Sequence, residues 1–209
     1  MSSRQIRVQC VDDHRILRDG LELIISQQRD MKLVASAATG EESVELFRRH
    51  RPDVTLMDLR LRGMSGIDAI RAIRRVDPNA RIVVLTMYEG DEDIYRALEA
   101  GAVTYLLKDT ISEDLIRVVR EVHSGQRPVA PAVAARLATR ASHETLTARE
   151  MEVMTHVAQG MRNKEIAAAL GCREATVQVH LKNIYSKLKV SDRTAAVTVA
   201  LQRGIVHVE

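Results

Sequence analysis

Five polar residues in the first part of the chain each stand at or just after the end of a short run of branched apolar residues. They are Asp12, Asp13, Asp58, Thr86 and Lys108. If these residues meet, three carboxylates raise one another's pKa, and a hard divalent cation such as Mg²⁺ relieves that repulsion. A carboxylate, a metal, a hydroxyl and an ammonium together suit a phosphoryl group on Asp58, whose charge the metal and Lys108 would neutralise.

The apolar runs that precede these residues are typical of strands buried on both faces of a parallel sheet. They cover residues 6–11, 33–37, 54–57, 82–86 and 104–107. Patterns of helical spacing alternate with them. These patterns lie at 16–25, after a Thr39/Glu42 capping box, at 91–100 and at 112–122. Five β/α units predict a doubly wound α/β fold with a five-stranded parallel sheet in the order 2-1-3-4-5.

This strand order decides whether the acids meet. Ligands bind open α/β sheets beyond the carboxyl ends of the strands, where the strand order reverses. In the order 2-1-3-4-5 the first and third strands are neighbours at that point. We therefore expect Asp12, Asp13 and Asp58 to converge there, with Thr86 and Lys108 facing the same pocket.

The composition changes after residue 124. Residues 1–124 carry a formal net charge of −2, whereas residues 125–209 carry +5. A Gly- and Pro-containing, then alanine-rich stretch predicts a linker over 125–144 and a second domain over 145–209. An acidic part joined to a basic part fits a nucleic-acid-binding domain attached to another module.

The second domain has only helical patterns. Thr147 and Glu150 form a capping box, and the helix they open ends at Gly160. Further helices are predicted over 163–170, 174–187 and 192–202. Four short helices with a Gly171-containing turn between the second and third predict an all-α helix-turn-helix domain.

The predicted helix over 174–187 has one apolar stripe and one polar face. Val177, Leu181, Ile184 and Leu188 form the stripe. Outside it lie Gln178, Val179, Lys182, Asn183 and Lys187. Gln and Asn can pair with adenine, Lys can reach guanine and Val can contact a thymine methyl group. This face is suited to reading a DNA major groove.

Other features exclude several classes of protein. No apolar run approaches the roughly 20 residues that a membrane span needs, and the N-terminus lacks the apolar core of a secretory signal. Two cysteines are too few for a disulfide framework or a structural zinc site. With one Phe, four Tyr and no Trp, the chain lacks the aromatic platforms of base-stacking RNA modules. We expect a cytoplasmic protein without a membrane partner.

The first domain, over 1–124, resembles the receiver domain of two-component response regulators. The resemblance is carried by the residues Val-Asp-Asp-His at 11–14, Leu-Met-Asp-Leu-Arg at 56–60, Leu-Thr at 85–86 and Gly-Ala-Val-Thr-Tyr-Leu-Leu-Lys at 101–108. It implies that Asp58 accepts a phosphoryl group from a cognate sensor histidine kinase. Departures from the family pattern are Arg62 where a Pro is usual, Thr104 in place of a Gly and Asp109 after Lys108.

The receiver resemblance also implies roles for individual residues. Asp13, Asp58 and the backbone carbonyl of Arg60 would bind Mg²⁺, and Asp12 would act mainly through water. Thr86 would move toward the phosphoryl group, and Tyr105 would turn inward into the space that Thr86 leaves.

The second domain resembles the LuxR-type helix-turn-helix of the NarL/FixJ subfamily, through residues 146–150, 163–167, 176–180 and 187–188. The resemblance implies a homodimer, formed on phosphorylation, on near-palindromic double-stranded DNA. Its implied base contacts are Gln178, Val179 and Lys182. Its implied phosphate contacts are Lys164, Thr176, Lys187 and Arg193. The last helix presents Ala195, Ala196, Val199 and Ala200 at helical spacing; some of this surface must pack on its own domain, and the resemblance implies that the remainder pairs two copies. Arg173 stands where a Ser usually caps the recognition helix.

The favoured interpretation is a transcriptional response regulator that is not an enzyme. A phosphohydrolase of the haloacid dehalogenase type also uses an Asp at a strand end, but Arg60 stands where its second Asp would act as general acid. A dinucleotide enzyme lacks support because no Gly-x-Gly-x-x-Gly follows the first strand. A DNA-binding protein with a phosphorylation-independent receiver is a third alternative, and the complete set of acids weighs against it.

Overall fold

The computed structural model describes residues 5–87, 90–108 and 111–207, with side chains from Asp114 onward in the last range. Asp109 therefore lies outside the described residues. The chain divides into two compact units, one of residues 1–87 with 95–133 and the other of residues 88–94 with 134–209. Within the described ranges, no helix is both long enough and apolar enough to cross a bilayer.

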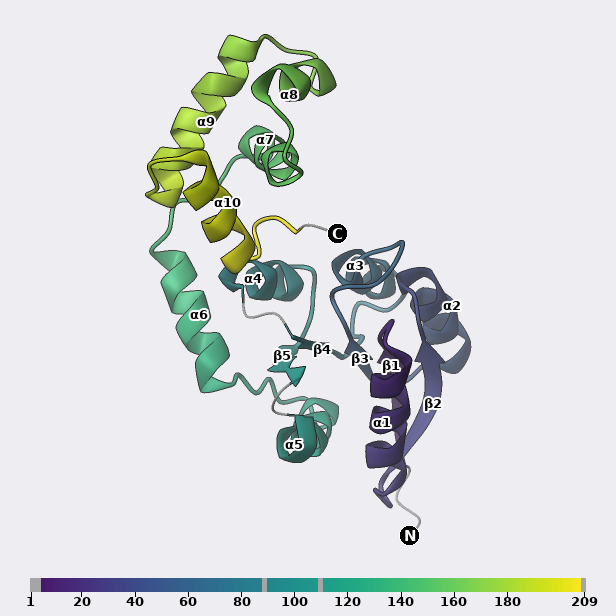
Figure 1. The fold of residues 1–209 in the computed structure, drawn as a ribbon. Coiled ribbons are helices and arrows are strands. Elements are labelled where there is room, and N and C mark those ends of the chain that lie inside the picture. The colour runs from purple at the N-terminus through teal and green to yellow at the C-terminus, as the bar shows by residue number, and fades with distance from the viewer. Residues whose placement is uncertain (1–4, 88–89, 109–110, 208–209) are drawn as a thin grey trace. The chain divides into compact units, whose positions relative to one another are not determined.

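The first unit is a parallel β-sheet covered by helices on both faces (Figure 1). Its strands are β1 (Ile6–Val11), β2 (Met31–Ala37), β3 (Val54–Met57), β4 (Ile82–Thr86) and β5 (Thr104–Leu107). Its helices are α1 (Arg15–Ser26), α2 (Gly40–His50), α3 (Gly66–Val76), α4 (Asp91–Glu99) and α5 (Ile111–His123). All strands pair in parallel in the order β2-β1-β3-β4-β5, which confirms the predicted fold.

The core of this unit lies between the sheet and the helices that pack on it. Leu21 and Ile25 of α1 and Leu115 and Val119 of α5 are buried against the strands in one cluster. Helices α2, α3 and α4 lie on the other side of the sheet (Figure 1). Because every strand is covered on both faces, its residues are almost continuously apolar, which is why the strands are readable in the sequence.

Two helix starts differ from the sequence prediction. The Thr39 side chain accepts from the Glu42 backbone as predicted. The Glu42 carboxylate, however, accepts from the backbone N–H of Ala38, so this capping box is only half formed. Helix α3 has no counterpart among the predicted helical patterns. It begins at the N-cap Ser65, whose hydroxyl accepts from the Asp68 backbone, and it buries Ile70 and Ile73.

In the second unit, four helices pack around an apolar core of their own. They are α7 (Ala148–Ala158), α8 (Asn163–Ala169), α9 (Glu174–Leu188) and α10 (Arg193–Gln202). The complete capping box of Thr147 and Glu150 opens α7, as predicted. Gly160 and Gly171 follow α7 and α8 with φ of 82° and 62°, a conformation that disfavours a side chain. Preceding them in sequence, the 125–144 stretch contains helix α6 (Pro131–Ala141).

The apolar stripe predicted on α9 forms the centre of this core. Val177, Leu181, Ile184 and Leu188 are all buried, with Met154 of α7 and Ile166 of α8 in the same cluster. Ala196 and Ala200 of α10 are buried there too, so they are the part of the predicted α10 surface that packs on its own domain. Because small side chains allow α10 to approach its neighbours closely, these alanines serve the fold of the unit itself.

Candidate functional site

Two buried carboxylates lie side by side at the carboxyl edge of the sheet. Asp12 directly follows β1 and Asp58 directly follows β3, and these strands are hydrogen-bonded neighbours. The backbone N–H of Asp58 donates to the Val11 carbonyl over 2.9 Å, which extends the ladder to the site. Asp12 is 1% exposed and Asp58 3%. Acids that are this deeply buried need a compensating positive charge.

Lys108 supplies that charge. It follows β5, and its side chain reaches past the end of β4 toward the two acids, with only 5% of its surface exposed. Its Nζ lies 2.5 Å from Asp12 Oδ2 and 2.7 Å from Asp58 Oδ2. One ammonium therefore holds two carboxylates whose positions in the sequence are 96 and 50 residues away from it.

Burial and this ion pair change the acidity of both partners. Burial raises the pKa of the Asp58 carboxyl above its ordinary value, and the bond and charge of Lys108 offset this only in part. Burial acts to lower the pKa of Lys108, but its bonds to Asp12 and Asp58 outweigh it, so the pKa is raised. Lys108 stays an ammonium, and Asp58 is a more basic carboxylate than one exposed to water.

Thr86 ends β4, between the strands that carry Asp58 and Lys108. Its side chain is fully buried, yet its Oγ1 has no hydrogen-bond partner among the residues that the structure describes. A buried hydroxyl without a partner costs free energy, and such groups mark places where a ligand supplies the missing bond. Tyr105 of β5 is also fully buried, so its ring already lies inside the unit.

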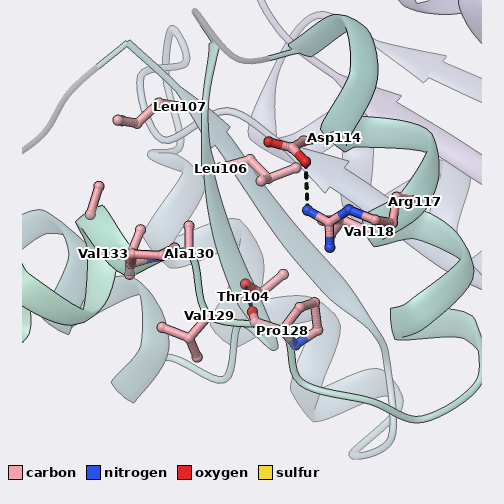
Figure 2. A pocket seen from close by; sticks show the side chains of 12 residues that line it. Thr104, Leu106, Leu107, Asp114, Arg117, Val118, Pro128, Val129, Ala130 and Val133 are labelled. Atoms are coloured by element: carbon pink, nitrogen blue, oxygen red, sulfur yellow. Dashed lines mark hydrogen bonds and ion pairs between the residues drawn. The ribbon is translucent and has the colours of Figure 1, made fainter.

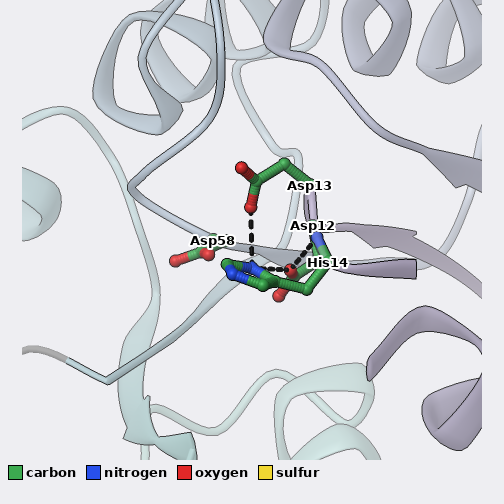
Figure 3. Close-up of side chains that lie close together, drawn as sticks. All are labelled: Asp12, Asp13, His14 and Asp58. Carbon is green, nitrogen blue, oxygen red and sulfur yellow. Dashed lines mark hydrogen bonds and ion pairs between the residues drawn. The ribbon is translucent and has the colours of Figure 1, made fainter. Parts of the chain in front are cut away.

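Asp13 completes a cluster of ligand atoms beside Asp12 and Asp58 (Figure 3). One possible ligand atom from each of Asp12, Asp13, His14 and Asp58 lies within 4.8 Å of the others. Asp13 Oδ1 is buried without a hydrogen-bond partner among the described residues. Three carboxylates against one ammonium, with a buried Asp13 oxygen that makes no hydrogen bond to the described residues, fit a divalent cation with oxygen ligands.

The remaining residues of this loop surround the acids more loosely. The Arg60 backbone N–H donates to Asp58 Oδ1 over 3.4 Å. The exposed Arg62 guanidinium lies 3.9 Å from Asp13 Oδ2, and Arg62 also pairs with Thr39 in an isolated β-bridge. That bridge fixes the loop although the usual Pro is missing.

Gly66 holds this loop against α3. Its N–H donates to the Leu59 carbonyl over 2.9 Å. A Cβ at this position would lie 2.0 Å from the Asp58 carbonyl oxygen and 2.6 Å from the Leu59 Cα. Only glycine allows the helix to start so close to the backbone of Asp58.

A separate hollow of about 480 Å³ lies beside β5 and α5, away from the acids (Figure 2). Leu106, Val118 and Val133 contribute to its largely apolar lining. The charged side chains on its wall, Asp114 and Arg117, pair with each other. No group in it is arranged for chemistry among the side chains that the structure describes.

In the second unit, most of the predicted DNA contacts lie on the surface. Gln178 and Lys182 are exposed on α9, and Val179 is 59% exposed, which is unusual for an apolar residue. Thr176 on α9 and Lys164 on α8 are exposed as well. These five side chains are accessible to a duplex, whereas the apolar face of α9 is buried.

Two predicted phosphate contacts are engaged within the unit instead. Lys187 Nζ lies 2.7 Å from Glu150 Oε2 and donates to the Thr145 carbonyl. Arg193 donates to the carbonyls of Met161 and Val157. Neither cation is free in this structure to contact a phosphate without exchanging these bonds.

Two residues make contacts that the sequence did not predict. His14 stands within the quoted Val-Asp-Asp-His motif, and its position directly after two acids is the signal that marks it. Glu150 was assigned only to a capping box, yet it is 4% exposed and also binds Lys187. Burial acts to raise the pKa of Glu150, but the bonds from Lys187 and Thr147 lower it below its ordinary value.

The comparisons with known proteins agree with this architecture. The response regulator receiver domain matches residues 8–120, and the luxR family of bacterial regulatory proteins matches residues 144–200. The chain therefore belongs to the two-component response regulators that join a receiver to a LuxR-type DNA-binding domain, of the NarL/FixJ kind. These are transcription regulators and not enzymes, which excludes the phosphohydrolase and dinucleotide-enzyme alternatives.

Its relatives share both domains. The chain is 37% identical over 207 residues to the response regulator protein VraR of Staphylococcus aureus, covering 97% of this chain and 99% of VraR. The crystal structure of the response regulator ChrA of a heme-sensing two-component system is 39% identical, with a TM-score of 0.58 over 96% of this chain and 98% of ChrA. The response regulator RcsB in complex with DNA is 23% identical, with a TM-score of 0.69 over 95% of this chain and 99% of RcsB, and shows the shared fold.

Proposed function

We propose that this protein is a DNA-binding transcriptional response regulator that is switched by phosphorylation of Asp58. The observation that carries the proposal is the buried Lys108 ammonium between Asp12 and Asp58, together with the buried Thr86 hydroxyl at the end of the intervening strand β4, which has no hydrogen-bond partner among the described residues. A phosphoryl group on Asp58 would bring negatively charged oxygens to this hydroxyl and ammonium, which can donate hydrogen bonds to them.

The phosphoryl group would come from a phosphohistidine of a cognate sensor histidine kinase, as the receiver domain implies. An oxygen of the Asp58 carboxylate attacks phosphorus, a P–O bond forms, the P–N bond breaks, and the leaving imidazole takes up a proton. The raised pKa of Asp58 makes its oxygen a better nucleophile. Lys108 is in place to neutralise charge that builds up on the transferred group.

The divalent cation proposed for this pocket is Mg²⁺, which neutralises charge on the phosphoryl oxygens when bound. Asp13, Asp58 and the backbone carbonyl of Arg60 would hold it, with Asp12 acting mainly through water. The close approach of one ligand atom each from Asp12, Asp13 and Asp58 supports this set.

The switch would run from Thr86 to Tyr105. Thr86 Oγ1 gains its missing hydrogen bond by moving toward the phosphoryl group, and the Tyr105 ring occupies the space that it leaves. Tyr105 is already buried in this structure. We therefore infer that phosphorylation stabilises an inward ring position that the unmodified chain can adopt.

The DNA contacts would come from the exposed face of α9 and from α8. Gln178, Val179 and Lys182 would meet base edges, and their exposure supports this. Lys164, Thr176, Lys187 and Arg193 would meet phosphates. Of these four, Lys187 and Arg193 would first have to release the intramolecular bonds that they make here.

The proposed organisation is a receiver over 1–124, a linker over 125–144 and the DNA-binding domain over 145–209. Phosphorylation would pair two copies on a near-palindromic duplex, as the two-fold symmetry of such sites requires. A protein with these partners acts in the cytoplasm, where kinase and chromosome are both within reach.

The experiment is phosphorylation with acetyl phosphate and Mg²⁺, followed by DNA selection. We expect an acid-stable, hydroxylamine-labile phosphoryl label on the full chain, which Asp58→Asn abolishes. We also expect genomic fragments to be enriched more strongly by the labelled protein than by Asp58→Asn. A label that survives Asp58→Asn contradicts the phosphoacceptor assignment. Equal enrichment by both proteins favours a phosphorylation-independent receiver.

A further inference from the structure

His14 places an imidazole nitrogen among the three carboxylates. Its Nδ1 lies 2.8 Å from Asp13 Oδ1 and 3.2 Å from Asp12 Oδ1 (Figure 3). The approach to Asp13 is close without the alignment of a hydrogen bond, since that oxygen has no hydrogen-bond partner among the described residues. A nitrogen and an oxygen that both bind one octahedral ion at about 2.1 Å are separated by about 3 Å. The two separations seen here are of this size.

The orientation of His14 is not explained by the helix that it precedes. His14 is the N-cap residue of α1, where Ser, Thr, Asp or Asn usually accepts from the first turn. Within the described part of the chain its side chain makes no such cap bond. The ring is 74% exposed and faces the acids on one edge, so it is within reach of a hydrated ion that enters from solvent.

Lys108 does not compete with His14, because it contacts different carboxylate oxygens. Its ammonium contacts Oδ2 of both Asp12 and Asp58, whereas His14 contacts the Oδ1 atoms of Asp12 and Asp13. The ammonium and the imidazole thus approach the acids through different oxygens. A cation bound among the Oδ1 atoms would have the imidazole as a neighbour without displacing Lys108.

We propose that His14 is a metal ligand of this pocket and a determinant of its metal specificity, which raises its affinity for divalent transition ions relative to Mg²⁺. The proposal rests on the proposed function, because it assumes that the pocket binds a divalent cation at all. Mg²⁺ prefers oxygen ligands, whereas an imidazole nitrogen favours ions such as Co²⁺, Ni²⁺ and Zn²⁺. Removing the imidazole therefore weakens the transition ions selectively.

The test compares the full-length protein with His14→Asn, which removes the nitrogen ligand and supplies a better N-cap. Calorimetric titrations with Co²⁺ and with Mg²⁺ give the ratio of the two affinities. We expect this ratio to fall at least tenfold in His14→Asn and to stay within twofold in His156→Asn, which removes an imidazole from the other unit. Asp13→Asn removes a proposed ligand of the pocket, so any Co²⁺ that this variant still binds with unchanged affinity is bound elsewhere on the chain. A ratio that changes less than twofold in His14→Asn overturns the proposal.

A second measurement reports the ligand directly. Electron spin-echo modulation of bound Mn²⁺ shows a ¹⁴N coupling when an imidazole nitrogen is a ligand. We expect this coupling in the wild-type protein and not in His14→Asn. Mn²⁺ that is bound without the coupling refutes the role of His14 and leaves the phosphoacceptor pocket intact. Failure of the wild-type protein to bind any of these ions refutes both the role of His14 and the proposed metal site.

Discussion

The two units place their chemistry in opposite ways. In the sheet unit the side chains proposed to take part in phosphoryl transfer are buried at the strand ends, where Asp12, Asp58 and Lys108 are each at most 5% exposed. In the helical unit the side chains proposed to act on DNA, such as Gln178 and Lys182, are exposed on one face of α9. A buried charge must be paired, so the pairing itself identifies the site. An exposed side chain needs no partner within the chain.

The cations of the helical unit illustrate this contrast. Lys187 of α9 and Arg193 of α10 are both proposed phosphate contacts, but both are bonded within the fold. Lys182 and Lys164 are of the same chemical type and remain exposed. Residue type alone therefore did not separate cations that hold the unit together from cations that are accessible to DNA. Burial and hydrogen bonding did.

The largest effect is expected from Lys108→Met in the sheet unit. Without metal, this change leaves two buried carboxylates facing each other, and removal of one partner of a buried ion pair costs about 3–5 kcal/mol. We expect faster hydrogen exchange of β1 and β3 in a chelator and partial recovery of protection in Mg²⁺. The amides of α7 and α9 in the same sample serve as the internal reference.

The matched control for this change is Lys32→Met, at an exposed lysine of β2. We expect it to alter protection by less than about 0.5 kcal/mol. Equal effects of the two substitutions would show that the buried ammonium contributes nothing particular to the pocket.

A smaller effect is expected from the exposed face of the helical unit. Lys182→Ala should weaken binding to the selected DNA site by about 1–3 kcal/mol and relax the preference at one base position. Lys164→Ala should weaken binding to all sequences and lower the salt dependence of affinity by about one unit of slope. Fluorescence anisotropy on selected and random duplexes at several salt concentrations separates the two. Identical behaviour of both variants would contradict the division into base and phosphate contacts.

Glu150→Gln tests the buried ion pair of the helical unit. It removes the charge that Lys187 and the start of α7 share, and we expect a loss of about 1–2 kcal/mol at neutral pH. Because the folded pKa of Glu150 lies below its ordinary value of 4.5, its contribution is present above that pH. The contribution is lost as the pH falls through the lower folded pKa.

Urea denaturation between pH 7 and pH 3 measures this difference. The wild-type advantage over Glu150→Gln should shrink as the pH falls below 4.5. Glu152→Gln, at the exposed neighbouring acid on α7, should show no comparable loss. A wild-type advantage that is constant with pH would contradict the assignment.

The smallest expected effect is an increase in the stability of the helical unit. Arg173 is the N-cap residue of α9 and makes no side-chain cap bond within the described residues. Arg173→Ser supplies an acceptor and should stabilise the helical unit by about 1 kcal/mol. Arg173→Ala, which supplies none, is the matched control, and thermal unfolding distinguishes the two. Equal melting temperatures would show that the start of α9 is already satisfied by other means.

The contrast between the units also explains what could be predicted from the sequence. The strands and their order were predictable because each strand is a short segment rich in buried apolar residues, and the order then placed Asp12, Asp58 and Lys108 at one edge. In the second unit, the stripe that includes Val177 and Leu181 marked α9, whereas the other helices followed from capping residues and from glycines at their ends. In both cases the pattern reflects burial, which the whole segment must satisfy.

Other features depend on single contacts and left no pattern. Helix α3 was not predicted as an element, although Ser65 and Asp68 carry its cap. The pairing of Lys187 with Glu150 joins residues 37 positions apart, and no spacing rule connects them. The Glu42 carboxylate accepts from the backbone N–H of Ala38 rather than from that of Thr39, a choice between adjacent backbone groups that depends on the local chain path.

The tight approach of Gly66 to the backbone of Asp58 has a consequence for protein engineering. Since no side chain fits between them, the stretch from Asp58 to Gly66 must be transplanted as one piece when a chimeric receiver is built. Exchanging α3 alone for a helix that lacks this glycine would keep the Asp58 carboxylate but displace the Asp58 backbone. Chimeras should therefore be joined before β3 or after α3, so that the exchanged segment contains both Asp58 and the glycine that packs against its backbone.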